Sequence, residues 1–116
     1  MATRSFITVV GSEGFTNEAG EKITQDWQVF GRYCHWDGYP EHMQVELRKI
    51  VKKFGVQEAK TRLLANDWSS IELKGEEIGT ANPNPTKTEY INETSDWGVE
   101  YIYIIHDSGL VTYVEV

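Results

Sequence analysis

Residues 40–54 read Pro-Glu-His-Met-Gln-Val-Glu-Leu-Arg-Lys-Ile-Val-Lys-Lys-Phe, and their apolar positions repeat with the period of an α-helix. The positions that form this apolar stripe are Met43, Leu47, Ile50, Val51 and Phe54. Pro40 suits the first position of a helix, and Gly55 suits the residue just beyond its end. The stretch therefore predicts one amphipathic helix that buries a single stripe.

A second, shorter helical pattern follows directly over residues 56–65. The two patterns together have the outline of a helix–turn–helix unit. The chain carries a net charge of −7 and has a pI near 4.9, which disfavours a DNA-reading role. We expect a helical hairpin, over about 40–54 and 56–65, that covers one face of a β-sheet.

Strand-like segments lie on both sides of these helices. Residues 5–10 are β-branched and aromatic, and residues 26–33 alternate, so we expect an antiparallel pair joined by a long polar loop over residues 11–25. Residues 100–105 and 110–114 flank the turn sequence Asp-Ser-Gly and predict a C-terminal β-hairpin.

The region between the helices and this hairpin has the least regular pattern. Residues 66–85 show no sustained periodicity, although residues 68–73 could form a short strand or turn. Residues 80–85 read as a loop because of their two prolines, and residues 86–92 could form another strand.

The predicted fold class is α+β, with an antiparallel sheet of about four to six strands. Both faces of the C-terminal hairpin are apolar or aromatic. The helices can cover one face only, so the other requires a second layer or another subunit. We therefore expect a homodimer or a higher homo-oligomer.

The bulk properties favour a single domain over residues 1–116. No apolar run approaches the roughly 20 residues needed to cross a bilayer. The N-terminal residues are too short and too alternating for a signal peptide, and we expect no membrane association. A single cysteine cannot form an intramolecular disulfide, so a reducing cytoplasm is the simplest location.

Charge is distributed unevenly along the chain. Residues 41–62 contain six basic and three acidic residues, whereas residues 63–116 contain two basic and ten acidic residues. One interpretation is a solvated basic helix face beside a solvated acidic surface. The other is a local positive site for an anionic ligand on an otherwise acidic protein. In either case, general coating of DNA is disfavoured.

The richest chemistry lies in residues 32–40, which read Arg-Tyr-Cys-His-Trp-Asp-Gly-Tyr-Pro. Asp37 and Gly38 account for a turn, because Asp supplies an Asx side chain and Gly tolerates positive φ. Turn chemistry does not explain why three aromatic residues gather at the same bend. Flat rings beside a guanidinium group suit a planar anionic ligand.

We therefore predict a ligand site in which arginines bind phosphate and aromatic rings stack on a base. The candidate residues are Arg4, Arg32, Trp36, Tyr39 and Arg48. Tyr33 and Trp27 are further candidates for stacking. The alternative is that the aromatic residues fill the core and the arginines are solvated.

The sequence supports a catalytic site or a metal site less well than it supports a ligand site. His35, Asp37 and His42 match no tight metal-ligand spacing, and a structural metal normally needs four ligands. Cys34 and His35 diverge if they lie on a strand, which places His35 poorly as a base for the thiol, so a buried and inert cysteine is the better interpretation. No acidic pair lies in a recognisable motif. We predict no catalytic residue, no metal and no cofactor.

Two sequence segments carry a resemblance to a known group of proteins. Residues 1–7 read Met-Ala-Thr-Arg-Ser-Phe-Ile, and residues 33–42 read Tyr-Cys-His-Trp-Asp-Gly-Tyr-Pro-Glu-His. This pairing resembles small proteins encoded by bacteriophages and prophages. The similarity covers residues 1–8 and 32–42 and extends loosely to residues 97–116. In function, the group that this pattern resembles is the Thoeris anti-defence sponge. The loop over residues 11–25 and the acidic second half depart from that pattern.

The resemblance implies a small α+β unit that oligomerises in the cytoplasm of an infected bacterium. It would sequester a host immune-signalling nucleotide, of the cyclic ADP-ribose type or a cyclic oligonucleotide, without cleaving it. Two other functions stay open. The protein could bind a host defence protein directly, as an anti-CRISPR or nuclease inhibitor whose acidic surface blocks a nucleic-acid channel. It could also cleave a nucleotide signal.

Overall fold

The structure is a computed structural model, and it describes residues 3–10, 15–16, 22–23, 31–82 and 98–115. The apolar stripe of residues 40–54 forms the helix α1 (Pro40–Phe54), as predicted, with Met43, Leu47 and Ile50 fully buried. Gly55 ends α1 with a φ of 84°, a backbone conformation that favours glycine. The second helix, α2 (Val56–Leu63), ends two residues before the predicted boundary at residue 65. The predicted helical hairpin is confirmed.

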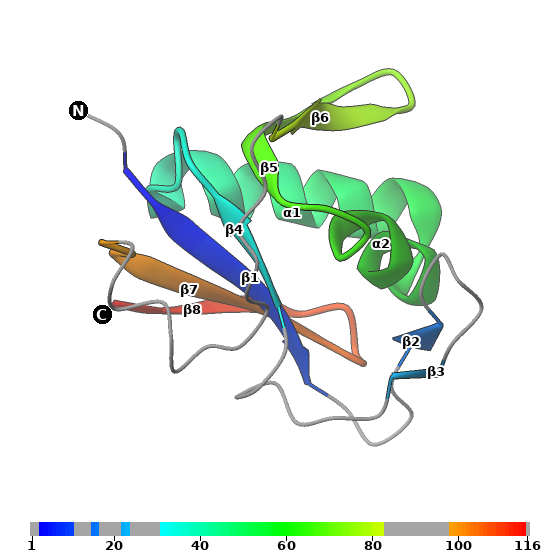
Figure 1. Ribbon diagram of the computed structural model, residues 1–116. Helices are drawn as coiled ribbons and strands as arrows, with labels where there is room; N and C mark the ends of the chain where they lie inside the picture. Colours follow the sequence, from blue (N-terminus) through cyan, green and yellow to red (C-terminus); the bar gives the residue numbers. More distant parts are fainter. Residues whose placement is uncertain (1–2, 11–14, 17–21, 24–30, 83–97, 116) are drawn as a thin grey trace.

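The described strands form one six-stranded sheet and one two-stranded sheet (Figure 1). The large sheet has the order β6-β5-β4-β1-β7-β8. Its strands, in chain order, are β1 (Ser5–Val10), β4 (Gly31–Cys34), β5 (Trp68–Lys74), β6 (Glu77–Ala81), β7 (Tyr101–His106) and β8 (Val111–Glu115). The small sheet pairs β2 (Phe15–Thr16) with β3 (Lys22–Ile23).

The α+β class, the number of strands and the C-terminal hairpin of β7 and β8 agree with the prediction. The predicted pairing of the first two long strands is also correct, because β1 and β4 are antiparallel. The sheet as a whole is mixed, however, and not antiparallel: β4 pairs with β5, and β1 with β7, in parallel. The helical hairpin causes the first of these parallel pairs, because it carries the chain back so that β5 runs in the direction of β4.

The strand boundaries differ from the prediction in two places. The strand expected over residues 26–33 is β4, from Gly31 to Cys34, and residues 24–30 lie outside the described part of the chain. The segment over residues 66–85 is more regular than its sequence indicates, since it contains the antiparallel pair of β5 and β6. The strand expected over residues 86–92 lies outside the described residues.

The main core lies between the sheet and the helices. Ile7, Cys34 and Tyr103 point from the sheet toward Leu47 and Ile50 of α1. A smaller cluster lies on the other face of the sheet, where Phe6, Tyr33 and Val99 are buried and Ile102 packs against them. The alternation of side chains along each strand sorts the residues into these two clusters.

An ion pair between a buried lysine and a partly exposed aspartate holds α2 to the C-terminal hairpin. The Lys60 side chain is fully buried and its Nζ donates to Oδ1 of Asp107, in the turn between β7 and β8. A buried ammonium group needs such a partner, because removing a charge from water is costly. Neither helix in the described part of the chain is long and apolar enough to cross a membrane.

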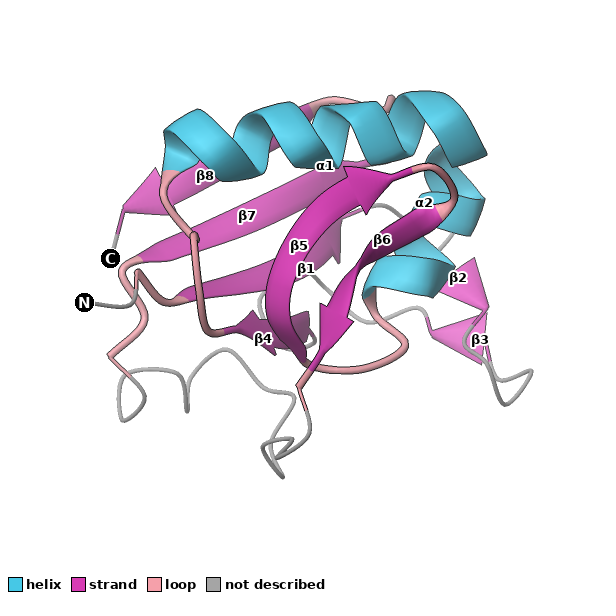
Figure 2. Ribbon diagram, turned by 90° about the horizontal axis from the view of Figure 1, so that it is seen from above, coloured by secondary structure: helices cyan, strands magenta, loops and turns pink. Residues whose placement is uncertain are grey.

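β5 leaves the plane of the sheet soon after it meets β4. Cys34 pairs with Trp68, and two further hydrogen bonds join His35 to Trp68 and Trp36 to Ser69. Beyond that point β5 curves over α1 (Figure 2). The backbone N–H and C=O groups of β5 that no longer face β4 must therefore find other hydrogen-bond partners.

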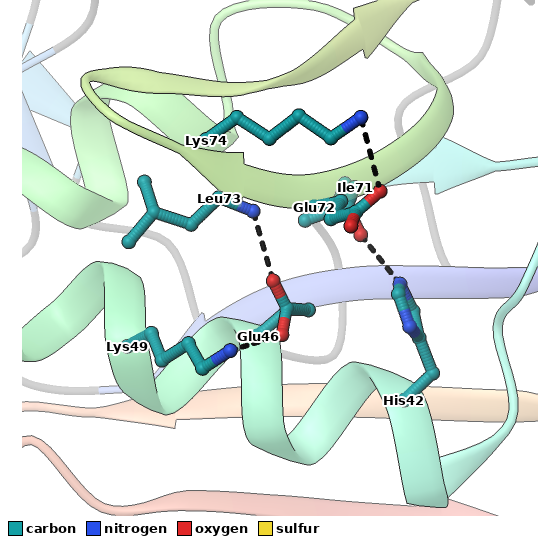
Figure 3. Close-up of polar contacts among 7 residues, drawn as sticks. All are labelled: His42, Glu46, Lys49, Ile71, Glu72, Leu73 and Lys74. Atoms are coloured by element: carbon teal, nitrogen blue, oxygen red, sulfur yellow. Dashed lines mark hydrogen bonds and ion pairs between the residues drawn. The ribbon is translucent and has the colours of Figure 1, made fainter.

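Side chains of α1 supply these partners (Figure 3). Nε2 of His42 donates to the carbonyl oxygen of Ile71 at 2.7 Å, and the backbone N–H of Leu73 donates to Oε1 of Glu46 at 2.9 Å. Nζ of Lys49 lies 3.0 Å from Oε2 of Glu46, so both carboxylate oxygens have partners. Burial acts to raise the pKa of Glu46, but these two donors prevail and hold the pKa below its ordinary value of 4.5.

Replacing Glu46 by Gln should therefore make the free energy of unfolding both smaller and less dependent on pH. Because the folded state lowers the pKa of Glu46, its stabilising contribution is complete above pH 4.5 and disappears as the pH falls through the lowered pKa. We expect Glu46→Gln to cost about 1–2 kcal/mol at pH 7. Urea unfolding at pH 7 and at several lower values measures both effects.

Glu72→Gln is the matched control, because Glu72 is exposed and lies 3.8 Å from Lys74 across the surface. It should change the free energy of unfolding little. If Glu46→Gln retained the acid dependence of the parent protein, the charge of Glu46 would not contribute to this contact.

Candidate functional site

The turn after β4 is fixed against the start of β1. The N–H of Gly38 donates to the carbonyl oxygen of Thr3 at 2.9 Å, and the hydroxyl of Tyr103 donates to the carbonyl oxygen of Gly38 at 2.6 Å. A Cβ at position 38 would lie 2.6 Å from the Thr3 oxygen, so only glycine fits there. Asp37 has a φ of 55°, which Asp tolerates better than most residues. The Asp-Gly pair is therefore required by the close approach of two backbone segments.

Three side chains at the end of β4 and on the turn after it form an ordered aromatic row, which consists of Tyr33, His35 and Trp36. The hydroxyl of Tyr33 and Nδ1 of His35 share a hydrogen bond of 2.8 Å. The rings of His35 and Trp36 meet edge to face, with their centroids 4.7 Å apart. Tyr33 is buried, whereas Trp36 is 49% exposed. The row thus leads from the smaller core out to a half-exposed indole.

The backbone of Trp36 is also fixed, because its N–H donates to the carbonyl oxygen of Ser69 at 2.8 Å. An exposed aromatic ring that is held by its backbone and by a neighbouring ring loses little conformational entropy when a ligand stacks on it. The indole is an open platform. Other residues line two hollows of about 210 Å³ each, which lie along the β5–β6 hairpin and between that hairpin and α2.

Arg4 approaches the aromatic row from β1. Ser5 pairs with Cys34, so Arg4 and His35 are the next positions along the two strands, on the face that carries Tyr33. Burial raises the pKa of Tyr33, and the positive charge of Arg4 opposes that rise. Nη1 of Arg4 lies 3.2 Å from the position of a Cβ on Gly98, so a glycine there leaves room for the guanidinium group.

Arg32 lies on the opposite face of β4 and is separated from the aromatic row. It pairs with Ile7, whose side chain belongs to the main core. Its Nε donates to the carbonyl oxygen of Leu64 at 2.8 Å, at the end of α2. The neighbouring carbonyl oxygen of Leu63 accepts a hydrogen bond of 2.8 Å from the indole N–H of Trp68. Arg32 therefore satisfies one of the carbonyl groups that every helix leaves unpaired at its C-terminus.

The other predicted site residues lie on the helix side of the turn. Tyr39 is 40% exposed and precedes α1, with its ring centroid 5.9 Å from that of His42. Arg48 is exposed on α1, nine residues further on, which corresponds to roughly 13 Å along the helix axis. Trp27 lies outside the described residues. The structure thus places Arg4 on the face of the sheet that carries Tyr33, and places Arg32 and Arg48 elsewhere.

The interpretation of Cys34 as buried and inert agrees with the structure. Its side chain is fully buried, and Sγ lies 3.5 Å from the carbonyl oxygen of Trp36. Burial raises the pKa of the thiol to about 12, so the nucleophilic thiolate is scarce at neutral pH. Within the described segments, no three His, Cys, Asp or Glu side chains are grouped as metal ligands.

His35 is the functional candidate that sequence reasoning missed. From the sequence it is considered only as a metal ligand or as a base for Cys34, whereas it connects Tyr33 to Trp36 and supports the exposed indole. The available signal was its position two residues after Tyr33 on an extended segment, which places both rings on the same face.

Comparisons with protein-family models, with curated proteins and with solved structures find no match for this chain. The assignment of a function therefore depends on the geometry of the turn and on the sequence resemblance alone.

Replacing Arg32 by Ala should destabilise the fold, although Arg32 was predicted from sequence to bind ligand. Loss of the guanidinium group leaves the carbonyl group of Leu64 without this donor, and hydrogen bonds to charged groups contribute about 1.5–3 kcal/mol. Urea unfolding should show a loss of that size. Lys74→Ala, which removes an exposed cation, should shift the unfolding free energy by less than about 0.5 kcal/mol. Equal stability of the two variants would show that Arg32 does not cap α2.

Proposed function

We propose that this protein captures a nucleotide-like anion at the turn after β4 and holds it without cleaving it. A base would stack on the indole of Trp36, and a phosphate would bind the guanidinium group of Arg4. The observation that carries this proposal is an exposed tryptophan held in place by its backbone and by His35. Arg4 supplies a cation on the face of the sheet that carries Tyr33.

The energetics of such a site are adequate for useful affinity. Stacking of a base on an aromatic side chain contributes roughly 1–3 kcal/mol. A guanidinium group binds phosphate oxygens through charge-assisted hydrogen bonds, which are stronger than neutral ones. Tyr39 offers a second exposed ring on the helix side of the turn. These contacts favour a planar base attached to a phosphate over a purely apolar ligand.

Capture without cleavage fits the side chains around the platform. The thiol of Cys34, the strongest nucleophile near the turn, is enclosed in the core and has a raised pKa. Its Sγ lies against the backbone of Trp36 and does not face the exposed ring. A ligand on the platform would therefore meet stacking and charge but no activated thiol.

The biological setting of the proposal comes from the sequence resemblance. We infer a bacteriophage anti-defence protein that acts in the cytoplasm of the infected host. Its ligand would be an immune-signalling nucleotide, either of the cyclic ADP-ribose type or a cyclic oligonucleotide. Sequestration would lower the free concentration of the signal and so prevent activation of the host effector.

A second function is favoured by the charge of the β5–β6 hairpin. Glu72, Glu76 and Glu77 are all exposed on this hairpin, which extends to one side of the helices (Figure 1). An acidic projection of this kind could enter the basic channel of a host nuclease and block nucleic acid. In that case the protein would bind its target directly and would take up no nucleotide.

One experiment separates capture, cleavage and direct inhibition. The protein is incubated with cyclic ADP-ribose or with a cyclic adenylate dinucleotide or trinucleotide, freed of unbound ligand and heat-denatured. Intact nucleotide in the supernatant would support capture. Degraded nucleotide would indicate an enzyme, and absence of uptake would favour direct inhibition through the acidic hairpin.

Replacing Trp36 by Ala should weaken the binding of the nucleotide that the protein takes up. Loss of the stacking surface should raise the dissociation constant roughly 5- to 150-fold, which corresponds to about 1–3 kcal/mol. Isothermal titration calorimetry measures this change. Arg4→Ala should also raise the dissociation constant, because it removes the guanidinium group that would bind the phosphate.

Leu110→Ala is a suitable control, because it removes a 56% exposed apolar side chain near the far end of α1. Its dissociation constant should equal that of the parent protein. An unchanged affinity in Trp36→Ala would exclude the indole as the binding platform.

A further inference from the structure

The strand β8 presents a regular edge that no other described strand pairs with. It is the outermost strand on its side of the described sheet. All five of its residues pair with β7 in an unbroken register, from Glu115 opposite Tyr101 to Val111 opposite Ile105. Tyr113 and Val114 are 42% and 47% exposed. A flat edge with exposed apolar side chains readily accepts another strand.

The hairpin fixes which backbone groups of β8 point outward. The N–H of His106 donates to the carbonyl oxygen of Leu110, so these two residues form a hydrogen-bonded pair. Such pairs alternate along antiparallel strands. Thr112 and Val114 therefore bond to β7, while Val111, Tyr113 and Glu115 direct their N–H and C=O groups away from the sheet.

The opposite edge of the sheet differs in ways that discourage pairing. The register of β6 against β5 shifts at two places, between Trp68 and Ser70 and between Ile71 and Lys74. A Cβ on Gly79 would lie 2.2 Å from the carbonyl oxygen of Ser70, which shows how closely the two strands approach at this irregularity. Bulges and charges are common protections of sheet edges, and β8 has no bulge.

The helix beside β8 carries a stripe whose charge changes sign along its length. This outer stripe consists of Glu41, Val45, Arg48 and Lys52, and all four side chains are exposed. They lie three or four residues apart and therefore follow one line on the surface of α1. The stripe is acidic at the start of the helix, apolar in the middle and basic toward its end.

The helix α1 runs antiparallel to β8. Its C-terminal part lies over the turn before β8, because Cγ1 of Val51 is 3.6 Å from the Cβ position of Gly109. Its start lies near the other end of the strand, where Glu41 contributes to the electrostatic environment of Tyr101, the partner of Glu115. The ten steps of helix from Glu41 to Val51 span roughly 15 Å, and the six steps from Gly109 to Glu115 span at most roughly 20 Å. The middle of this part of α1 is thus level with Thr112 and Tyr113, near the middle of β8.

We propose that β8 and the outer stripe of α1 form a homodimer interface with a second copy of the chain, related by a two-fold axis at Tyr113. Antiparallel pairing about this axis places Tyr113 opposite itself and Val111 opposite Glu115 of the second copy. The outward N–H groups of each strand then meet outward carbonyl groups of the other. The two sheets become one continuous sheet, with an α1 helix from each copy on the same face.

Charge complementarity favours a second copy as the occupant. Because the two helices run antiparallel, Glu41 of each copy lies level with Lys52 of the other, and the apolar Val45 lies between them. A stripe with one sign of charge throughout would repel itself in this arrangement. This inference depends on β8 and α1 alone and does not require the proposed nucleotide function.

Sedimentation equilibrium of the full chain tests the proposal. We expect a species of twice the 13.3 kDa mass of the chain at micromolar concentration. Tyr113→Pro removes an outward N–H while keeping the hydrogen bonds between β7 and β8, so it should give a monomer. A monomeric parent protein would overturn the proposal.

Charge reversal provides a test that does not disturb the backbone. Glu41→Lys and Lys52→Glu should each weaken the dimer at least several-fold, because each places like charges opposite one another. The double variant should restore the dimer, because it exchanges the two charges. Lys53→Glu is the matched control: it makes the same charge change on an exposed residue outside the outer stripe and should leave the dimer intact. A dimer that survived Tyr113→Pro and both single reversals would show that another surface is used.

Discussion

The partial separation of β4 and β5 is the constraint on which the remaining structure depends. The two strands share one parallel pair, Cys34 with Trp68, and two further backbone hydrogen bonds from the turn. The helix α1 occupies the space that opens beyond this junction. His42 and Glu46 then act as substitutes for a neighbouring strand, since they satisfy backbone groups of β5 that would otherwise be unpaired. One helix thus contributes both apolar burial and the polar groups that hold a curved strand.

The same junction explains how an aromatic turn can be both structural and available for binding. Its glycine, Gly38, is locked between Thr3 and Tyr103, and its tryptophan is tied by backbone to β5. Tyr33 at the start of the turn is buried in the smaller core, while the indole of Trp36 remains half exposed. Burial and exposure of aromatic rings are therefore not exclusive within one short motif, because Tyr33 fills the core while Trp36 stays half exposed.

Local pattern was sufficient to predict the helices, the β1–β4 pair and the C-terminal hairpin. These elements are encoded by periodicity and by nearby turn residues, such as Gly55 and Gly109. Contacts between distant parts of the chain were not predictable in the same way. Arg32 contacts a carbonyl group 32 residues away, and nothing in its neighbourhood indicates a helix-capping role. The parallel pairing of β1 with β7 also joins distant segments of the chain. The sequence of β6 lacks a strand pattern of its own, because β6 is held mainly by its pairing with β5.

The enclosure of Cys34 has a practical consequence for following how this protein opens. The thiol lies at the junction of β4 and β5, and it can meet a thiol-specific reagent only when that junction separates. The rate of its chemical labelling therefore reports opening at this single point of the sheet. With only one cysteine in the chain, that signal needs no engineered probe and no correction for other sites.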